Sequence, residues 1–369
     1  MKRAVSISTV FILLLGSCGI FHWFPPAINN NLIVQPASLL TSFDGVMSPA
    51  DFDFGVNSND TLHMFLNTSG SLYFYAYDMS ADRWNTNYFA GIGLNPKMDY
   101  DGGSGLSGMY IVTPNVFQIT YENQGGWQYF QETAGNSNST QIYDYCAGPG
   151  TACALVYQNS IATSEFFVFT LGSTNNYQFD FFSQMNSPGT IFDLSIDHNS
   201  YGTLFIGIAQ PDSVAIFSFA GPSTVKQYTI PYGKGIAKVV VTKDERIYLF
   251  FQNDENELIA KVFEYRDNDL KDYAEFTVYT GGIKIEPSFL PNALDIEYDA
   301  VNGNIYAAFI DPGNNYPIIM KIRNTQVSPV FMIPSHETNS RCIKITVDQD
   351  GDPVAGVLNY SNTLNFYSR

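Results

Sequence analysis

Apolar and polar residues alternate along this chain in short stretches, and one order of stretches returns seven times. Each copy begins with a charged residue on an alternating stretch, and a turn then leads to a second stretch of small, apolar and aromatic residues. Successive copies begin 46, 45, 49, 45, 57 and 49 residues apart. This period is typical of the four-stranded blade of a propeller. The copies begin at Asp53, Asp99, Asp144, Asp193, Lys238, Asp295 and Lys344.

The sixth copy predicts the strands of one blade. Residues 295–299 alternate, an Asn-Gly pair supplies a strong hairpin signal, and residues 305–309 form the second strand. Residues 318–322 and 327–332 follow as the third and fourth strands. The predicted fold class is therefore all-β, a seven-bladed β-propeller built of four-stranded antiparallel blades.

The last copy lacks a fourth strand. Its third strand is predicted at residues 363–367, and the sequence given stops at Arg369. An unpaired edge strand is an aggregation hazard, so we expect another segment to cover it. Part of the apolar segment 32–43 is predicted to supply the missing outer strand and close the ring within one domain, residues 32–369.

The first residues predict export. Lys2 and Arg3 precede an apolar run at residues 4–15, which is too short to span a bilayer and is typical of a signal peptide. The sequence Leu15-Gly16-Ser17-Cys18 then resembles the lipobox of bacterial lipoproteins. The resemblance implies a signal peptide at residues 1–17, acyl chains such as palmitate on Cys18, and a tether at residues 18–31. An ordinary secretory signal with a chance cysteine is the alternative.

The residue after Cys18 is Gly19, and not the aspartate that often retains such proteins in the inner membrane. The resemblance therefore implies a lipid-anchored protein of the cell envelope, at the outer membrane. Without Lys2 and Arg3 the chain has 16 basic and 35 acidic residues, a net charge of −19, which disfavours nucleic acid as a partner. Residues 98–225 contain no Lys or Arg, which indicates either drift on a solvated surface or a partner contact made through uncharged side chains.

The repeat resembles β-propeller repeats of the NHL type and the bacterial repeats written DIAVD-x-x-GN. The best match is Asp295-Ile296-Glu297-Tyr298-Asp299 followed by Gly303-Asn304-Ile305-Tyr306. The resemblance implies the architecture over nearly the whole mature chain. It implies no active site, because these families bind and catalyse many different things.

One charged residue of each copy is expected at the start of an innermost strand, lining a central channel. Lys238, Asp295 and Lys344 can neutralise one another, whereas the four preceding carboxylates cannot. These carboxylates either accept backbone N–H groups from the adjoining loop or bind a divalent cation such as calcium. The ring residues are Asp53, Asp99, Asp144, Asp193, Lys238, Asp295 and Lys344, and the possible metal ligands are Asp99, Asp144 and Asp193.

The cysteines and histidines give less information about a functional site than the ring residues do. Cys146 and Cys153 flank a tight hairpin in an exported chain, so a disulfide between them is expected. Cys342 is then left over, and a buried thiol is the expected state. No two of the four histidines have the spacing of metal ligands, so zinc or copper is not expected.

Two functions fit this sequence. The favoured one is a binding or scaffold module, monomeric and anchored to the membrane by its lipid, which recognises a protein or a glycan through its loops. The alternative is an enzyme that depends on a divalent cation, such as a lyase, lactonase or glycosidase, with its site at the channel mouth. No catalytic residue is predicted.

Overall fold

The computed structural model divides the chain into two compact units, residues 1–34 and 35–369. It describes residues 37–368, and the stretches that it leaves out are 49–50, 58, 60, 101–105, 114–115, 124–125, 134–139, 149–150, 160–163, 172–178, 187–189, 221–224, 286–291 and 334–338. The predicted signal peptide, Cys18 and the tether lie outside the described residues. Within the described part of the chain, no helix is long and apolar enough to cross a membrane.

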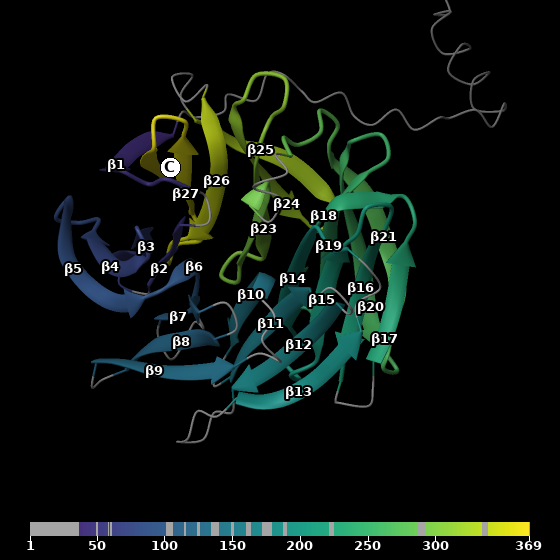
Figure 1. The fold of residues 1–369 in the computed structure, drawn as a ribbon. Helices are drawn as coiled ribbons and strands as arrows, with labels where there is room; N and C mark the ends of the chain where they lie inside the picture. The colour runs from purple at the N-terminus through teal and green to yellow at the C-terminus, as the bar shows by residue number, and fades with distance from the viewer. Residues whose placement is uncertain are drawn as a thin grey trace, which may run out of the picture. The chain divides into compact units, whose positions relative to one another are not determined.

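The described residues are built from β-strands (Figure 1). The strands up to the middle of the chain are β1 (Ser38–Asp44), β2 (Phe52–Val56), β3 (Thr61–Thr68), β4 (Ser71–Asp78), β5 (Arg83–Ile92), β6 (Leu94–Tyr100), β7 (Leu106–Thr113), β8 (Val116–Asn123), β9 (Gly126–Thr133), β10 (Thr140–Gly148), β11 (Thr151–Asn159), β12 (Ser164–Leu171), β13 (Phe179–Asn186) and β14 (Asp193–His198). The remaining strands are β15 (Leu204–Ala209), β16 (Val214–Phe219), β17 (Val225–Ile230), β18 (Gly233–Val241), β19 (Arg246–Asn253), β20 (Leu258–Arg266), β21 (Asp269–Tyr279), β22 (Leu294–Asp299), β23 (Asn304–Ile310), β24 (Pro317–Arg323), β25 (Gln326–Met332), β26 (Ser340–Val347), β27 (Pro353–Asn359) and β28 (Thr363–Ser368).

The strands described form seven four-stranded antiparallel sheets. Six sheets each contain four consecutive strands, from β2–β5 to β22–β25, and the last has the order β1-β28-β27-β26. The strands predicted for the sixth copy are present as β22 to β25, most of them longer by a residue or two. Alternation in the sequence therefore placed these strands correctly.

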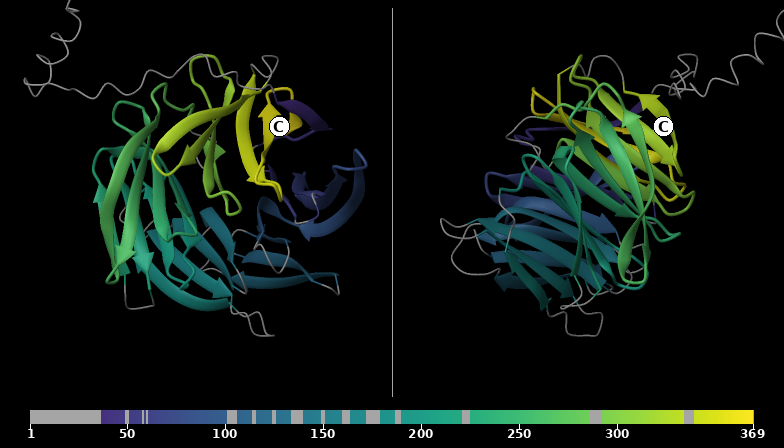
Figure 2. Two further views of the ribbon diagram at one scale, coloured as in Figure 1. Left: turned by 180° about the vertical axis from the view of Figure 1, so that it is seen from behind. Right: turned by 90° about the vertical axis from the view of Figure 1, so that its right-hand side faces the viewer.

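The N-terminal strand closes the last sheet, as the sequence predicts. Strand β1 pairs with β28 from Ser38 opposite Ser368 to Asp44 opposite Thr363, and Figure 2 shows purple β1 beside the yellow C-terminal strands. The Trp84 ring packs against this closure, with its centroid 5.6 Å from Phe43. The edge of β28 is therefore covered by a strand from the other end of the chain.

The first strand of each sheet, called here the inner strand, contacts the inner strands of both neighbouring sheets. These contacts run from β2 through β6, β10, β14, β18, β22 and β26 and return to β2. Figure 1 shows the last strands β5, β9 and β13 on the outside. One set of alternate side chains on each inner strand is apolar and faces the preceding sheet; Phe52 and Phe54, for example, pack with Val354 and Leu358. The other set faces the following sheet.

Candidate functional site

A cavity of about 560 Å³ lies among the inner strands, and all seven of these strands contribute to its lining. Its charged side chains are Asp53, Lys97, Asp99, Asp144, Asp197, Lys238, Lys243, Glu245, Asp295, Glu297 and Lys344, joined by His198. Seven carboxylates therefore share this cavity with four lysines. That excess of negative charge favours cations and disfavours anions.

The structure places every predicted ring residue on an inner strand. They lie on β2 (Asp53), β6 (Asp99), β10 (Asp144), β14 (Asp193), β18 (Lys238), β22 (Asp295) and β26 (Lys344). All of them line the cavity except Asp193, whose side chain is fully buried. The predicted ring residues therefore lie on equivalent strands of the seven sheets, although Asp193 does not line the cavity.

The forward-facing side chains of β14 hydrogen-bond to the next inner strand. An inner strand is the edge of its sheet, so every second backbone N–H lacks a partner within that sheet. Asp193, Ser195 and Asp197 accept hydrogen bonds from three such groups on β18. The donors are the N–H groups of Ala237 at 3.2 Å, Val239 at 2.6 Å and Val241 at 2.6 Å. We call such a boundary between neighbouring inner strands a seam.

Three other ring carboxylates form the same kind of bond. Asp53 accepts the N–H of Met98 at 2.8 Å, Asp144 that of Ile196 at 3.1 Å, and Asp295 that of Ile345 at 2.7 Å. The expectation that such carboxylates accept N–H groups from the adjoining loop is therefore wrong in its choice of partner. The donor is the neighbouring sheet, because only there are edge N–H groups left over.

The ring lysines also pair differently from the prediction. Lys238 lies 2.9 Å from Asp193, and Lys344 lies 3.0 Å from Asp53 and donates to the Phe52 carbonyl at 2.7 Å. Burial raises the pKa of Asp193 to about 6, against the opposing effect of Lys238.

Lys97 is a cavity cation that the sequence reasoning overlooked. Its ammonium lies 3.8 Å from Asp144. Burial lowers the pKa of Lys97, but the carboxylates of Asp144, Asp53, Asp295 and Asp193 outweigh burial and raise it. Its position two residues before Asp99, on the same face of β6, is the signal that could have identified it.

Glu297 is a second residue that the sequence reasoning missed. It lies on β22 two residues beyond Asp295, and it accepts no hydrogen bond from the part of the chain that the structure describes. Burial raises the pKa of Glu297 well above its usual range, and the charges of Asp99, Asp295, Asp197 and Asp53 raise it further. Glu297 is therefore the cavity carboxylate with the least compensation.

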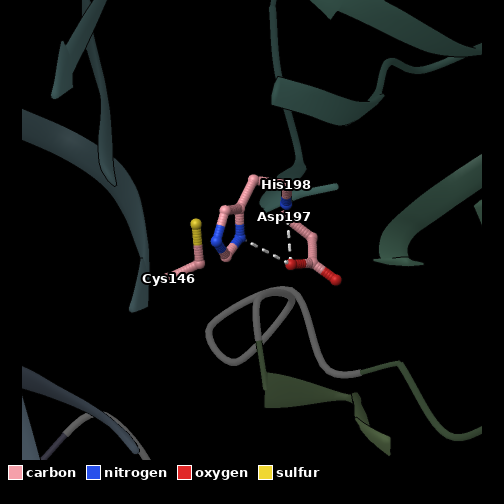
Figure 3. A group of neighbouring side chains, drawn as sticks. All are labelled: Cys146, Asp197 and His198. Carbon is pink, nitrogen blue, oxygen red and sulfur yellow. Dashed lines mark hydrogen bonds and ion pairs between the residues drawn. The ribbon is translucent and has the colours of Figure 1, made fainter. Parts of the chain in front are cut away.

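The cysteine region brings together residues that are distant in sequence. Strand pairing places Cys146 directly opposite Cys153, the Cys146 side chain is buried, and the side chain of Cys153 lies outside the described residues. Their disulfide therefore stays a prediction. Cys146 instead lies beside Asp197 and His198 (Figure 3). Spacing rules missed this group because 51 residues separate Cys146 from Asp197.

Cys342 is buried on β26, and burial raises the pKa of its thiol to about 12. A thiol held in its neutral form is a poor nucleophile and a poor metal ligand. The expected state of a buried thiol agrees with this environment.

Three solved structures with similar folds are remote from this chain in sequence. A chain of the "Mitotic Checkpoint Complex" has a TM-score of 0.59 at 11% identity, with 100% of this chain and 99% of that chain covered. A chain of the hydrazine synthase of Kuenenia stuttgartiensis has 0.56 at 12% identity, with 86% and 95% covered. The Aleuria aurantia lectin in complex with Fucα1-6GlcNAc has 0.51 at 9% identity, with 79% and 98% covered.

No protein-family model and no curated protein sequence matches the chain. The structural similarities nevertheless define the class of fold. The chain has a β-propeller fold, all-β, with four-stranded antiparallel sheets. Propellers of this kind include lectins and members of protein complexes.

Proposed function

We propose that this chain is a seven-bladed β-propeller that acts as a binding or scaffold module for a protein or glycan partner. One observation carries this proposal: four of the five ring aspartates accept backbone N–H groups across seams. Carboxylates engaged in this way stabilise the ring instead of surrounding one ion. The resulting rigid ring is the kind of scaffold on which loops recognise partners.

The partner would bind the face formed by the turns between first and second strands. Ser200, Glu245 and Ala300 belong to three of these turns and line the cavity, so the cavity opens among them. Neighbouring turns are joined, because Ser200 donates to Glu245 and Asn302 donates to the Asp350 carbonyl at 2.9 Å. Such cross-links between turns give a partner a preorganised surface.

Two exposed side chains lie at the tips of these turns. Tyr201 is 85% exposed and Val301 is 70% exposed. A tyrosine on a fixed surface is a typical anchor for a partner, and Val301 would add apolar contact area beside such an anchor.

Site-specific photo-crosslinking in intact cells tests this face. A photoreactive phenylalanine analogue replaces Tyr201 in one variant and Tyr360 in the control. Tyr360 is 47% exposed on the turn between β27 and β28, at the other end of the strands. Adducts at position 201 that excess soluble propeller removes would support the proposal. Equal labelling at both positions, or none at position 201, would contradict it.

Anchoring is part of the same proposal. The lipobox resemblance supports acylation at Cys18, and Gly19 supports an outer-membrane location. An alkyne-tagged fatty acid should label the wild-type chain but not Cys18→Ser, and membrane fractionation should recover the label with the outer membrane. Unchanged labelling of Cys18→Ser would contradict the lipid anchor.

The enzyme alternative has one observation in its favour, the uncompensated carboxylate of Glu297 beside Asp99. Oxygen ligands of this type favour calcium or magnesium. A calcium site there would stabilise the folded state by about 2.7 kcal/mol at a hundredfold excess over its dissociation constant. The melting temperature should then rise with calcium, and Glu297→Gln should abolish the rise. An unchanged melting temperature in calcium and in EDTA would exclude this alternative.

A further inference from the structure

Three possible metal ligands of different types converge at one end of the cavity. Cys146 comes from β10, and Asp197 and His198 come from the end of the next inner strand, β14. One donor atom from each lies within 4.8 Å of the other two. Figure 3 shows the His198 ring between the Cys146 sulfur and the Asp197 carboxylate.

The spacing of two of these donors suits a small ion. Nδ1 of His198 lies 3.4 Å from Oδ1 of Asp197. Two ligands about 2.0 Å from one tetrahedral zinc ion are about 3.3 Å apart. The Cys146 sulfur lies within 4.8 Å of a donor atom of each of the other two residues. We propose that Cys146, Asp197 and His198 bind a zinc-like divalent transition-metal ion.

The seam between β14 and β18 holds one ligand in place. Oδ2 of Asp197 accepts the N–H of Val241 at 2.6 Å, and Oδ1 accepts the N–H of His198 at 2.7 Å. A ligand carboxylate that other groups already orient loses little freedom when the metal binds. Asp197 therefore connects the structural seam to the metal site.

The donor set distinguishes this ion from calcium. A thiolate and an imidazole prefer zinc and its neighbours among the transition metals, whereas calcium prefers oxygen ligands alone. The carboxylate excess of the cavity attracts a cation of either type. Three protein ligands also leave a fourth position toward the cavity, where water or a small ligand can bind.

The site requires Cys146 in its reduced form, because a disulfide with Cys153 would remove the thiolate. The test therefore starts with the full chain carrying Cys18→Ser, purified in detergent, reduced, desalted and checked by mass spectrometry. Zinc is titrated against a chromophoric chelator, and cobalt is titrated in a parallel sample. We expect one zinc per chain and a thiolate-to-cobalt charge-transfer band.

Substitutions at the site separate metal binding from folding. Cys146→Ser should abolish the charge-transfer band, and His198→Gln should weaken zinc binding at least tenfold. Cys342→Ser and His63→Gln are the matched controls, since each removes a buried cysteine or histidine elsewhere, and both should retain the zinc. A melting curve of each variant in EDTA confirms that it folds.

Two results would overturn the proposal. The first is a reduced protein that binds less than one zinc per chain. The second is a folded Cys146→Ser or His198→Gln variant with wild-type zinc affinity. A Cys146–Cys153 disulfide that persists after treatment with reductant would overturn the proposal in the same way as the first result, because the thiolate would then be unavailable to metal.

Discussion

The seam between β14 and β18 differs from the seam between β22 and β26. In the first, three forward-facing side chains of β14 each accept an N–H of β18. In the second, the corresponding positions of β22 are Asp295, Glu297 and Asp299, and only Asp295 accepts an N–H of β26. Asp299 instead accepts the N–H groups of Val301 and Asn302 in its own hairpin.

The difference shows how one position in the repeat serves two purposes. A polar side chain that meets an edge N–H group stabilises the ring. Glu297, at the same kind of position, meets no such group in the described chain and faces the cavity as an uncompensated carboxylate. Removing an acceptor of β14 that bonds across its seam and neutralising Glu297 should therefore have opposite effects on stability.

The largest expected loss of stability is at the seam between β14 and β18. Asp193→Ala removes a carboxylate that lies 2.9 Å from the nearly buried Lys238 ammonium and accepts the N–H of Ala237. Removing one member of a buried ion pair costs about 3–5 kcal/mol of unfolding free energy, measurable as a lower urea midpoint. The double variant Asp193→Ala/Lys238→Met should recover much of this loss. A single variant within 1 kcal/mol of wild type would show that the pair does not support the ring.

A smaller effect is expected at the middle of the same seam. Ser195→Ala leaves the N–H of Val239 buried without its acceptor, which should cost about 1–3 kcal/mol in urea unfolding. Ser213→Ala is the control, since that hydroxyl bonds only to Gln210 within its own turn. The control should stay within about 0.5 kcal/mol of wild type. Equal losses of unfolding free energy in Ser195→Ala and Ser213→Ala would show that the seam contributes no more to stability than an ordinary turn.

Buried His63 makes the free energy of unfolding depend on pH, so the two seams should be compared above pH 6.5. Burial lowers the pKa of His63 to about 4 from 6.5. The unfolded chain therefore takes up a proton that the folded chain refuses, so the contribution of His63 to stability is full above pH 6.5 and is lost as the pH falls toward 4, whereas the raised pKa values of Asp193 and Glu297 act in the opposite direction. The contribution of His63 should fall by roughly 2 kcal/mol between pH 7 and pH 5. The difference between wild type and His63→Gln in how the urea midpoint changes with pH measures this contribution, and the same change in both proteins would contradict it.

The sequence predicted the frame of the molecule well and its site only in part. Alternation within a repeat that returns every 45 to 57 residues located the strands of the sixth copy, and the missing fourth strand predicted the closure by β1. Both are consequences of local pattern and of edge protection, which a single sequence contains.

The partners of the ring residues could not be predicted in the same way. Asp193 bonds to the N–H of Ala237 because two inner strands meet at one relative height, and that height depends on packing between sheets. The meeting of Cys146 with His198 has the same origin. Lys97 and Glu297 could have been predicted from the sequence, since each lies two residues from a ring position.

The most direct test of the account compares two isosteric amide substitutions, Asp193→Asn and Glu297→Gln, by urea unfolding at pH 7.5. Asp193→Asn should lower the free energy of unfolding, because it leaves the nearly buried Lys238 ammonium without the Asp193 counter-charge, and this loss outweighs the relief of the burial that raises the pKa of Asp193 to about 6. Glu297→Gln should raise it by about 0.5–2 kcal/mol, because it removes a repulsive charge that nothing compensates. Changes of opposite sign in the free energy of unfolding would support the account that Asp193 stabilises the ring and Glu297 does not. A loss of stability in both variants would contradict it.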